Sequence, residues 1–294
     1  MKLIKINDIN IPEVQIYNER SETHLKRMFE PKAGLFIAET PNVITRAIDA
    51  GFKPYSVLAE EKYLNSDVLE KASRASGTDD FPVYTADSEV LSKIAGYKLT
   101  RGILCALYRK ENGYSDKADP ANDPVTDLIE RLPLNNKKTS RIAILEDVMN
   151  PTNLGAIFRS AAALDIDAVI LTNGCTDPLY RRASRVSMGC VFQIPWTVLG
   201  KAYPDTATLL RSLKEKGYVT VAMALKNDSI SISDKKLKNA DKLAIILGTE
   251  GEGLKDSTIA SCDHTAKIPM SHGVDSLNVA AASAVIFWEM TKTE

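Results

Sequence analysis

The second half of the chain alternates short apolar runs with helical runs, and this alternation limits the possible fold more than any other feature. The apolar runs are nearly continuous, which is typical of parallel strands that helices cover on both faces. The strand-like runs are RIAILEDV, DAVILTN, VFQIPWTVL, YVTVAMAL, KLAIILGT and HTAKIPM, with helical runs such as NLGAIFRSAAAL and TATLLRSLKEKG between several of them. The pattern predicts a doubly wound, mostly parallel α/β domain over residues 140–294.

The first 110 residues predict a smaller α/β domain. ETHLKRMFE is typical of a helix, and PNVITRAIDAGF predicts a second helix with Pro41 near its start and Gly51 past its end. Strand-like runs follow the same alternation: GLFIAE, YSVLAEE, FPVYTA and GILCALYR. Residues 111–139 are rich in Asp, Asn and Pro and are interpreted as a linker that a short helix, VTDLIERL, interrupts.

The composition of the chain limits its fold and function less than the alternation of strand-like and helical runs does. A length of 294 residues suits one large domain or two ordinary ones, and 44% hydrophobic residues suffice for a sizeable core. The formal net charge of −1 neither indicates nor excludes a nucleic-acid-binding protein, because a local basic face can bind phosphates. The four cysteines, Cys105, Cys175, Cys190 and Cys262, lack metal-site spacing and suggest free thiols in a reducing cytosol. No metal site is expected.

Membrane and export signals are not expected either. Charges are scattered through the N-terminal segment MKLIKINDIN, which therefore lacks the apolar core of a signal peptide. The most apolar segment, VAAASAVIFW, is shorter than the ~20 residues that span a bilayer. The sequence thus predicts a soluble, cytoplasmic protein.

The segment LGTEGEGL at 247–254 is a glycine-rich loop after a strand, but it does not suit a phosphate. A Walker loop requires a lysine, whereas this loop carries Glu250 and Glu252 and no lysine, and carboxylates would repel a bound polyphosphate. A dinucleotide-binding loop would follow the first strand of its unit, whereas this one follows a late strand. The loop favours a neutral or cationic ligand that the backbone approaches closely.

Three segments in order resemble the motifs of the SpoU family of RNA 2′-O-ribose methyltransferases. They are EDVMNPTNLGAIFRSAAAL at 146–164, AIILGTEGEGL at 244–254 and IPMSHGVDSLNVAAASAVIFWE at 268–289; DPLYRRASRVSMGCVFQIP is also similar to the family. The resemblance implies the SPOUT fold, with a trefoil-knotted site for S-adenosyl-L-methionine (AdoMet), over about residues 140–290.

The N-terminal part resembles, more loosely, the L30e-like RNA-binding domain that often precedes this fold. The matching pattern is NERSETHLKRMFEPKAGLFIAETPNVITRAIDAGF. Where the family usually has Glu-Gly after the strand, this chain has Glu39-Thr40. The implied organisation is an L30e-like domain at 1–110, a linker at 111–139 and a SPOUT methyltransferase domain at 140–294.

The resemblance implies that AdoMet is held largely by backbone of the second and third motifs. The implied cofactor residues are Met223, Ala224, Leu247, Gly248, Gly253, Ile268, Met270 and Leu277. These positions could equally be ordinary strand ends and core residues.

The implied catalytic residues are Asn153, Arg159, Glu250, Ser276 and Asn278. Each residue also has a local interpretation. Asn153, Ser276 and Asn278 could cap helices. Arg159 could be a solvated surface side chain, and Glu250 could be a solvated loop carboxylate. In the family the arginine is the proposed activator of the ribose hydroxyl. Because arginine rarely loses its proton, orienting the hydroxyl and stabilising an alkoxide is the easier chemistry. His272, in the third motif, is interpreted as a loop residue near the site.

Arg181, Arg182 and Arg185 form the best local basic patch and are predicted to contact RNA phosphates, or alternatively to be a solvated patch. The resemblance further implies a homodimer, with Arg159 acting across the interface, and favours ribosomal over transfer RNA. Methylation of a base, an RNA- or AdoMet-binding protein without activity, and a Rossmann dehydrogenase remain alternatives.

Overall fold

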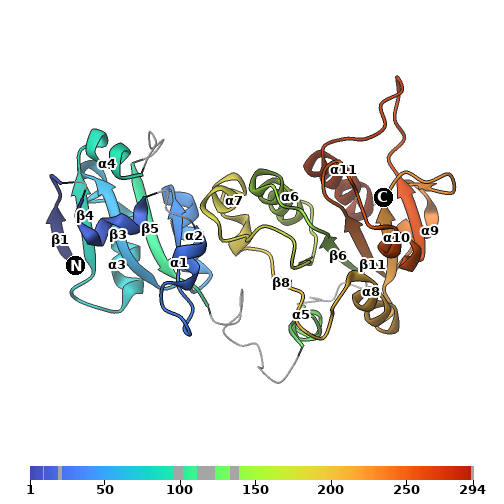
Figure 1. Ribbon diagram of the computed structural model, residues 1–294, viewed down its shortest axis with the longest axis horizontal. Coiled ribbons are helices and arrows are strands. Elements are labelled where there is room, and N and C mark those ends of the chain that lie inside the picture. The colour runs from blue at the N-terminus through green and yellow to red at the C-terminus, as the bar shows by residue number, and fades with distance from the viewer. Residues whose placement is uncertain (9, 19–21, 96–101, 111–122, 133–138, 293–294) are drawn as a thin grey trace. The chain divides into compact units, whose positions relative to one another are not determined.

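A computed structural model describes residues 1–8, 10–18, 22–95, 102–110, 123–132 and 139–292 (Figure 1). The chain divides into two compact units. Unit 1 comprises Met1–Asp116 and Pro178–Gln193, and unit 2 comprises Lys117–Asp177 and Ile194–Glu294. Residues 111–122 and 133–138 of the predicted linker lie outside the described residues, whereas the helix predicted within it is present as α5 (Pro124–Glu130).

Unit 1 is built on a five-stranded sheet in the order β1-β4-β3-β5-β2, in which β5 runs antiparallel to its neighbours β3 and β2. Its elements are β1 (Lys2–Lys5), η1 (Pro12–Tyr17), α1 (Glu22–Arg27), β2 (Leu35–Glu39), α2 (Pro41–Asp49), β3 (Pro54–Glu60), η2 (Glu61–Tyr63), α3 (Asp67–Ser76), β4 (Pro82–Ala86), α4 (Ser88–Ala95), β5 (Ile103–Tyr108), α7 (Arg181–Val186) and η3 (Cys190–Phe192). The short helix α2 begins at Pro41 and ends before Gly51, as the sequence predicts. The resemblance of this unit to L30e-like domains stays a prediction.

Residues 178–193 pack in unit 1, although the sequence placed them within the C-terminal domain. Phe192 of η3 lies against Phe36 and Phe52, with ring centroids 5.7 and 5.4 Å apart. Helix α7 contacts β2, and Arg46 of α2 donates a hydrogen bond to the carbonyl of Met188 at 2.7 Å. Aromatic packing and polar contacts, neither of which has a local sequence signal, therefore fix this segment.

Unit 2 is built on a seven-stranded sheet in the order β10-β12-β9-β11-β6-β7-β8, and every neighbouring pair is parallel. Besides α5, its elements are β6 (Ser140–Leu145), α6 (Pro151–Ala163), β7 (Ala168–Leu171), β8 (Trp196–Val198), α8 (Thr206–Glu215), β9 (Val219–Met223), β10 (Ile230–Ser231), α9 (Lys235–Lys238), β11 (Lys242–Leu247), α10 (Asp256–Ser261), β12 (His264–Lys267) and α11 (Val279–Thr291). The predicted α/β class with a mostly parallel sheet is confirmed. The trefoil knot stays a prediction.

Helices cover both faces of this sheet, which explains why its strands are apolar throughout. Helices α5 and α8 contribute to the buried core on one face, and α10 packs against α8, whereas α6 and α11 pack against each other (Figure 1). Strand β6 is buried along its full length, and β11 along all but its first residue. The register aligns Leu145 with Leu247, so the carboxyl ends of these two strands lie side by side.

One expectation about unit 2 was wrong in detail. The run VFQIPWTVL is not one strand: it begins in η3 and contributes only Trp196–Val198 as β8, because Pro195 interrupts it. Helix α11 buries Ile286 and Phe287 but keeps one exposed face, on which Val285 and Trp288 are 38% and 58% exposed.

Candidate active site

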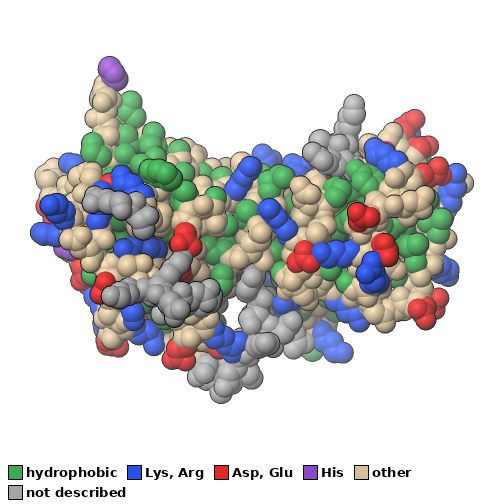
Figure 2. All heavy atoms as spheres, turned by 180° about the vertical axis from the view of Figure 1, so that it is seen from behind, with side chains coloured by type: hydrophobic (Ala, Val, Ile, Leu, Met, Phe, Trp, Pro, Cys, Tyr) green, Lys and Arg blue, Asp and Glu red, His purple; other side chains and the backbone are tan. Residues whose placement is uncertain are grey.

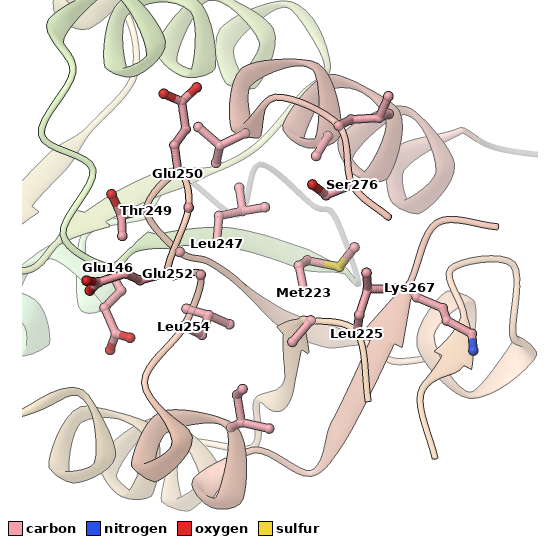
Figure 3. Close-up of a pocket in the computed structure, with 18 of the residues that line it drawn as sticks. Glu146, Met223, Leu225, Leu247, Thr249, Glu250, Glu252, Leu254, Lys267 and Ser276 are labelled. Atoms are coloured by element: carbon pink, nitrogen blue, oxygen red, sulfur yellow. The ribbon is translucent and has the colours of Figure 1, made fainter. Parts of the chain in front are cut away.

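A cavity of about 1090 Å³ opens at the carboxyl ends of four neighbouring strands of unit 2, β12, β9, β11 and β6 (Figure 3). A loop that lines the cavity follows each strand, and these loops begin at Glu146, Ala224, Gly248 and Ile268. In open parallel sheets, loops at this edge form the usual ligand site.

All eight residues predicted to hold the cofactor line this cavity. They are Met223, Ala224, Leu247, Gly248, Gly253, Ile268, Met270 and Leu277. The structure thus brings together positions from β9, the glycine-rich loop and the segment after β12. Their binding of AdoMet is a prediction that the geometry permits.

The glycine-rich loop, residues 248–254, requires glycine for two different reasons. A Cβ at Gly248 would lie 2.4 Å from the carbonyl carbon of Gly253, because the loop folds back on itself through a bridge between Thr249 and Gly253. Gly251 and Gly253 adopt φ of +85° and +72°, which side chains disfavour. Figure 3 shows the side chains of Glu250 and Glu252 pointing to different sides of this loop.

Three predicted catalytic residues meet at the rim of the cavity. The amide of Asn153 donates a hydrogen bond of 2.5 Å to Oε1 of Glu250, and the amide of Asn278 donates to the same oxygen. Asn278 also donates to Oδ1 of Asn153 at 3.2 Å. Residues from α6, the glycine-rich loop and the start of α11 therefore form one hydrogen-bonded cluster, although up to 125 positions separate them in sequence.

The interpretation of Asn153 as a helix N-cap was wrong. Helix α6 begins at Pro151, and its N-cap is Asn150, whose side chain accepts from the amide of Thr152 at 2.8 Å. Asn153 lies inside the first turn and is buried. Its side chain is therefore available for Glu250.

Asn278 combines both roles that the sequence suggested. Its Oδ1 accepts a hydrogen bond of 3.0 Å from the amide of Ala280 and caps α11, while its amide group faces Glu250. Ser276 lines the cavity two residues earlier and is exposed. His272 is exposed with φ of 59° and is not among the residues that line the cavity.

Arg159 is separate from this cluster. It lies on α6, is exposed and does not line the cavity. Six residues separate it from Asn153, a rotation of about 240° on an α-helix, so the two side chains leave different faces. The structure does not bring Arg159 to the site of its own chain.

Glu146, Asp147 and Lys255 lie beside the glycine-rich loop, and reasoning from the sequence did not select them. Glu146 is 1% exposed and accepts hydrogen bonds from Thr206, Thr258 and the backbone amide of Lys255. The available signal was an acidic pair directly after an apolar strand, where a buried carboxylate must find donors.

Asp147 forms an ion pair with Lys255, whose Nζ lies 2.8 Å from Oδ2. Burial alone would raise the pKa of Asp147, but the hydrogen bonds from Lys255 and Thr172 outweigh it, so the pKa lies below its ordinary value. The hydrogen bond to Asp147 raises the pKa of Lys255. The pair is therefore charged at neutral pH.

The charge of the cavity suits a cation. Among the described residues, six acidic side chains line it (Glu146, Asp147, Glu250, Glu252, Asp256 and Asp275) against three basic ones (Lys226, Lys255 and Lys267). The excess of three negative charges opposes a polyphosphate and favours a sulfonium. This balance agrees with the ligand class inferred from the loop sequence.

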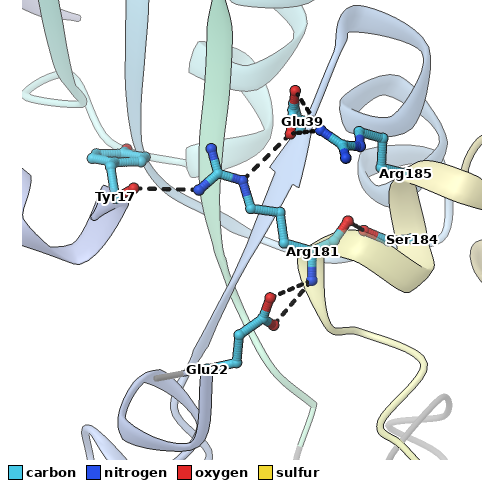
Figure 4. Close-up of polar contacts among 6 residues, drawn as sticks. All are labelled: Tyr17, Glu22, Glu39, Arg181, Ser184 and Arg185. Atoms are coloured by element: carbon cyan, nitrogen blue, oxygen red, sulfur yellow. Dashed lines mark hydrogen bonds and ion pairs between the residues drawn. The ribbon is translucent and has the colours of Figure 1, made fainter. Parts of the chain in front are cut away.

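The predicted RNA-binding arginines lie on or beside α7 in unit 1, and two of them are engaged within the fold (Figure 4). Nη1 of Arg185 lies 3.2 Å and Nε of Arg181 3.4 Å from Oε2 of Glu39, which is 1% exposed. The backbone amide of Arg181 donates to Glu22, and its Nη1 donates to the carbonyl of Tyr17. Arg182 is the exposed member of the cluster.

The part of the chain that the structure describes shows neither a metal-binding cluster nor a membrane-spanning helix. No group of three or more His, Cys, Asp or Glu side chains there could hold a metal ion. Nor is any described helix long and apolar enough to cross a membrane. The four cysteines are free.

Comparison with known proteins identifies sequence relatives. The model of the SpoU rRNA methylase family matches residues 140–288. A protein from Mycobacterium tuberculosis, described as an uncharacterized tRNA/rRNA methyltransferase, is 34% identical over 260 residues, which are 88% of this chain and 81% of that protein. The 23S rRNA (guanosine-2′-O-)-methyltransferase RlmB of Ralstonia nicotianae is 29% identical over 76% of this chain and 80% of its own length.

Solved structures share the fold along nearly the whole chain. An AdoMet-bound rRNA methyltransferase from Sinorhizobium meliloti covers 98% of this chain and 97% of its own, with a TM-score of 0.73 and 22% identity. A structure described as an RNA 2′-O ribose methyltransferase gives a TM-score of 0.70 at 21% identity. Together with the family match and the mycobacterial relative, the parallel sheet and its glycine-rich loop lead to one conclusion: the chain belongs to the SpoU rRNA methylase family.

Proposed function

We propose that the protein transfers a methyl group from AdoMet to a ribose 2′-OH of ribosomal RNA. The convergence of Asn153, Glu250 and Asn278 at the rim of the cavity carries this proposal. Family membership and the activity named for the RlmB relatives support it. Residues 153, 250 and 278 come from all three motifs, which argues against a protein that only binds RNA or AdoMet.

The residues that line the cavity suit the chemistry of AdoMet. Met223, Leu247, Met270 and Leu277 offer apolar surface for an adenine, and the bare backbone of the glycine-rich loop offers hydrogen bonds at close range. The acidic lining suits the sulfonium. When bound, AdoMet supplies an electrophilic methyl group, so the protein has to supply proximity, alignment and activation of the hydroxyl.

Glu250 is suited to orient the attacking hydroxyl. Its Oε1 is occupied by the amides of Asn153 and Asn278, whereas Oε2 accepts no hydrogen bond from the described residues. Oε2 can therefore accept the hydrogen bond of a ribose hydroxyl. The two amides fix the carboxylate in place before substrate binds, which lowers the cost of alignment.

A second copy of the chain completes the proposed site. Ala281, Val285 and Trp288 are exposed at positions i, i+4 and i+7 of α11, so they form one apolar stripe. Figure 2 shows hydrophobic side chains gathered on the part of unit 2 that carries α11. Burial of this stripe in a homodimer would let Arg159 act at the cavity of the partner, where it stabilises the developing alkoxide.

RNA contact by the arginine cluster is part of the proposal, and Arg182 is its exposed member. An exposed guanidinium can bind a phosphate in two hydrogen bonds. This contact would add affinity rather than sequence specificity.

The test is transfer of labelled methyl from AdoMet into unmodified ribosomal and transfer RNA, followed by alkaline hydrolysis. A 2′-O-methyl group blocks cleavage at its own nucleotide, so label is expected in alkali-resistant dinucleotides from ribosomal RNA. Label only in mononucleotides would indicate base methylation, and label only in transfer RNA would change the substrate class. The absence of label in both RNAs despite AdoMet binding would indicate a protein that binds AdoMet without transferring its methyl group.

The proposed role of Arg159 has a test of its own. Arg159→Ala and Glu250→Ala are each expected to lower activity at least about 100-fold. If Arg159 acts across the dimer, mixed dimers of the two variants regain one intact site and therefore activity; if it acts within its own chain, they stay inactive. Arg211→Ala, at an exposed position on α8 outside the cavity, is the matched control.

A further inference from the structure

Both ends of the glycine-rich loop are attached to Glu146. The backbone amide of Glu146 donates to the carbonyl of Leu247, the residue before the loop, at 2.8 Å. Its carboxylate accepts from the backbone amide of Lys255, the residue after the loop, at 2.9 Å. One residue at the end of β6 thus holds the loop at its entry and its exit.

The carboxylate of Glu146 is itself fixed by two hydroxyl groups. Thr206 at the start of α8 and Thr258 in α10 donate to Oε2 at 2.5 and 2.6 Å. Glu146 is 1% exposed, so these bonds do not compete with bulk water. All three donors to the carboxylate are neutral.

Asp147 attaches the loop a second time, through the side chain of Lys255. Its own orientation is fixed by Thr172, which accepts a hydrogen bond from the backbone amide of Asp147 and donates one to Oδ1 at 2.7 Å. A Cβ at Gly174 would lie 2.2 Å from Oδ1, so the glycine leaves space for this carboxylate. Two adjacent acidic residues therefore bind the same lysine, one through its backbone and one through its side chain.

We infer that Glu146 and Asp147 form a clamp that holds the glycine-rich loop in its ligand-binding conformation, and that Glu146 is a positioning residue for AdoMet. This inference rests on the proposed function. Neither residue has to touch the cofactor for the effect, because the clamp acts on the loop that carries Gly248, Glu250 and Gly253.

The clamp acts through the population of the binding-competent loop. An apparent dissociation constant rises in inverse proportion to the fraction of molecules in the competent conformation. Loss of the clamp that reduces this fraction to about one tenth would weaken AdoMet binding about tenfold. Once AdoMet is bound, the loop is ordered again, so the maximal rate changes little.

The experiment compares Glu146→Ala with Glu146→Gln by calorimetric titration of AdoMet and by methyl transfer to ribosomal RNA. Glu146→Ala is expected to raise Kd and KM for AdoMet about tenfold or more, with kcat nearly unchanged. The glutamine side chain would keep one acceptor for the amide of Lys255, and its NH₂ group can donate to both threonine hydroxyls. Glu146→Gln is therefore expected to stay within about threefold of the wild type.

Asp263 offers a matched control. Its carboxylate accepts from the amide and hydroxyl of Thr220 at 2.9 and 2.8 Å and pairs with Lys214 at 2.8 Å, but it does not line the cavity. Asp263→Ala is expected to lower the melting temperature without changing the affinity for AdoMet. If Glu146→Ala folds poorly, Thr258→Val removes one donor to Glu146 and is expected to raise Kd by a smaller factor.

The outcomes separate this inference from the proposed function. Equal losses of melting temperature in Glu146→Ala and Asp263→Ala, both with the AdoMet affinity of the wild type, would overturn the clamp alone. A fall in kcat without a change in KM for AdoMet would also contradict it. A wild-type protein that does not bind AdoMet would refute the proposed function and the clamp together.

Discussion

Glu39 in unit 1 and Glu146 in unit 2 are both 1% exposed, and both lie at the carboxyl end of a buried strand. Glu39 is neutralised by two arginines, whereas the hydrogen bonds to the Glu146 carboxylate come from two hydroxyls and a backbone amide. A buried carboxylate needs compensation in either case. Opposite charge thus attaches residues 178–193 within unit 1, while neutral donors shape the loop of the candidate site in unit 2.

The residues that follow these glutamates differ as well. Thr40 has φ of 81° and ψ of 148°, and Asp147 has φ of 55°. Aspartate tolerates the left-handed region, but the region that Thr40 occupies is close to one that is nearly exclusive to glycine. The L30e-like pattern usually has glycine at the position of Thr40, and a glycine there would adopt this backbone conformation without strain.

The largest expected effect is from exchanging each glutamate for glutamine. Glu39→Gln removes the negative charge that lies beside Arg181, whose side chain is only 11% exposed, and is expected to cost about 3 kcal/mol of unfolding free energy. Glu146→Gln keeps its hydrogen bonds with neutral donors and is expected to cost less than about 1 kcal/mol. Urea-induced unfolding of both variants measures the difference.

Arg185→Ala is the control for the first of these variants. Its side chain is 38% exposed, so a smaller loss is expected than for Glu39→Gln. Equal losses for Glu39→Gln and Glu146→Gln would mean that the two carboxylates are compensated in the same way.

A smaller effect of opposite sign is expected at the residue after Glu39. Thr40→Gly relieves the strained backbone and removes a buried hydroxyl that has no hydrogen-bond partner among the described residues. The glycine also loses more backbone freedom on folding, so a net gain of about 1 kcal/mol is expected. Thermal unfolding measures it.

Thr40→Ala separates the two contributions, because it removes the hydroxyl but keeps a Cβ in the strained conformation. Most of the gain should be absent from this variant. A gain of equal size in Thr40→Ala would assign the effect to the hydroxyl rather than to the backbone.

The smallest effect concerns the pH dependence of the Asp147–Lys255 pair. The pKa of Asp147 is lowered in the folded state, so the pair stabilises the protein above the ordinary aspartate pKa and loses that contribution as pH falls through the folded value. The melting temperature of the wild type should exceed that of Asp147→Asn at about pH 7, and the difference should shrink toward about pH 3. A difference that is constant with pH would show that the ionic contact adds no stability.

The sequence by itself determined the α/β class, the parallel strands of unit 2, the glycine-rich loop and the bounds of α2, because these depend on local periodicity and on backbone preferences of proline and glycine. The resemblance also selected eight cofactor positions that line the cavity, but not Glu146, Asp147 or Lys255. The sequence misplaced the N-cap of α6, since Asn150 and Asn153 both suit that position and only the start at Pro151 distinguishes them.

Only the tertiary structure decided which side chains meet. Glu250 accepts hydrogen bonds from residues 97 positions before and 28 positions after it, and Glu146 reaches donors 60 and 112 positions away. The arginines of α7 were predicted to face RNA, yet two of them pair with Glu39, 142 and 146 positions earlier (181 minus 39 and 185 minus 39). Such contacts follow from how helices pack on the sheet and from the need of buried charges for partners, and neither is encoded within one segment of the chain.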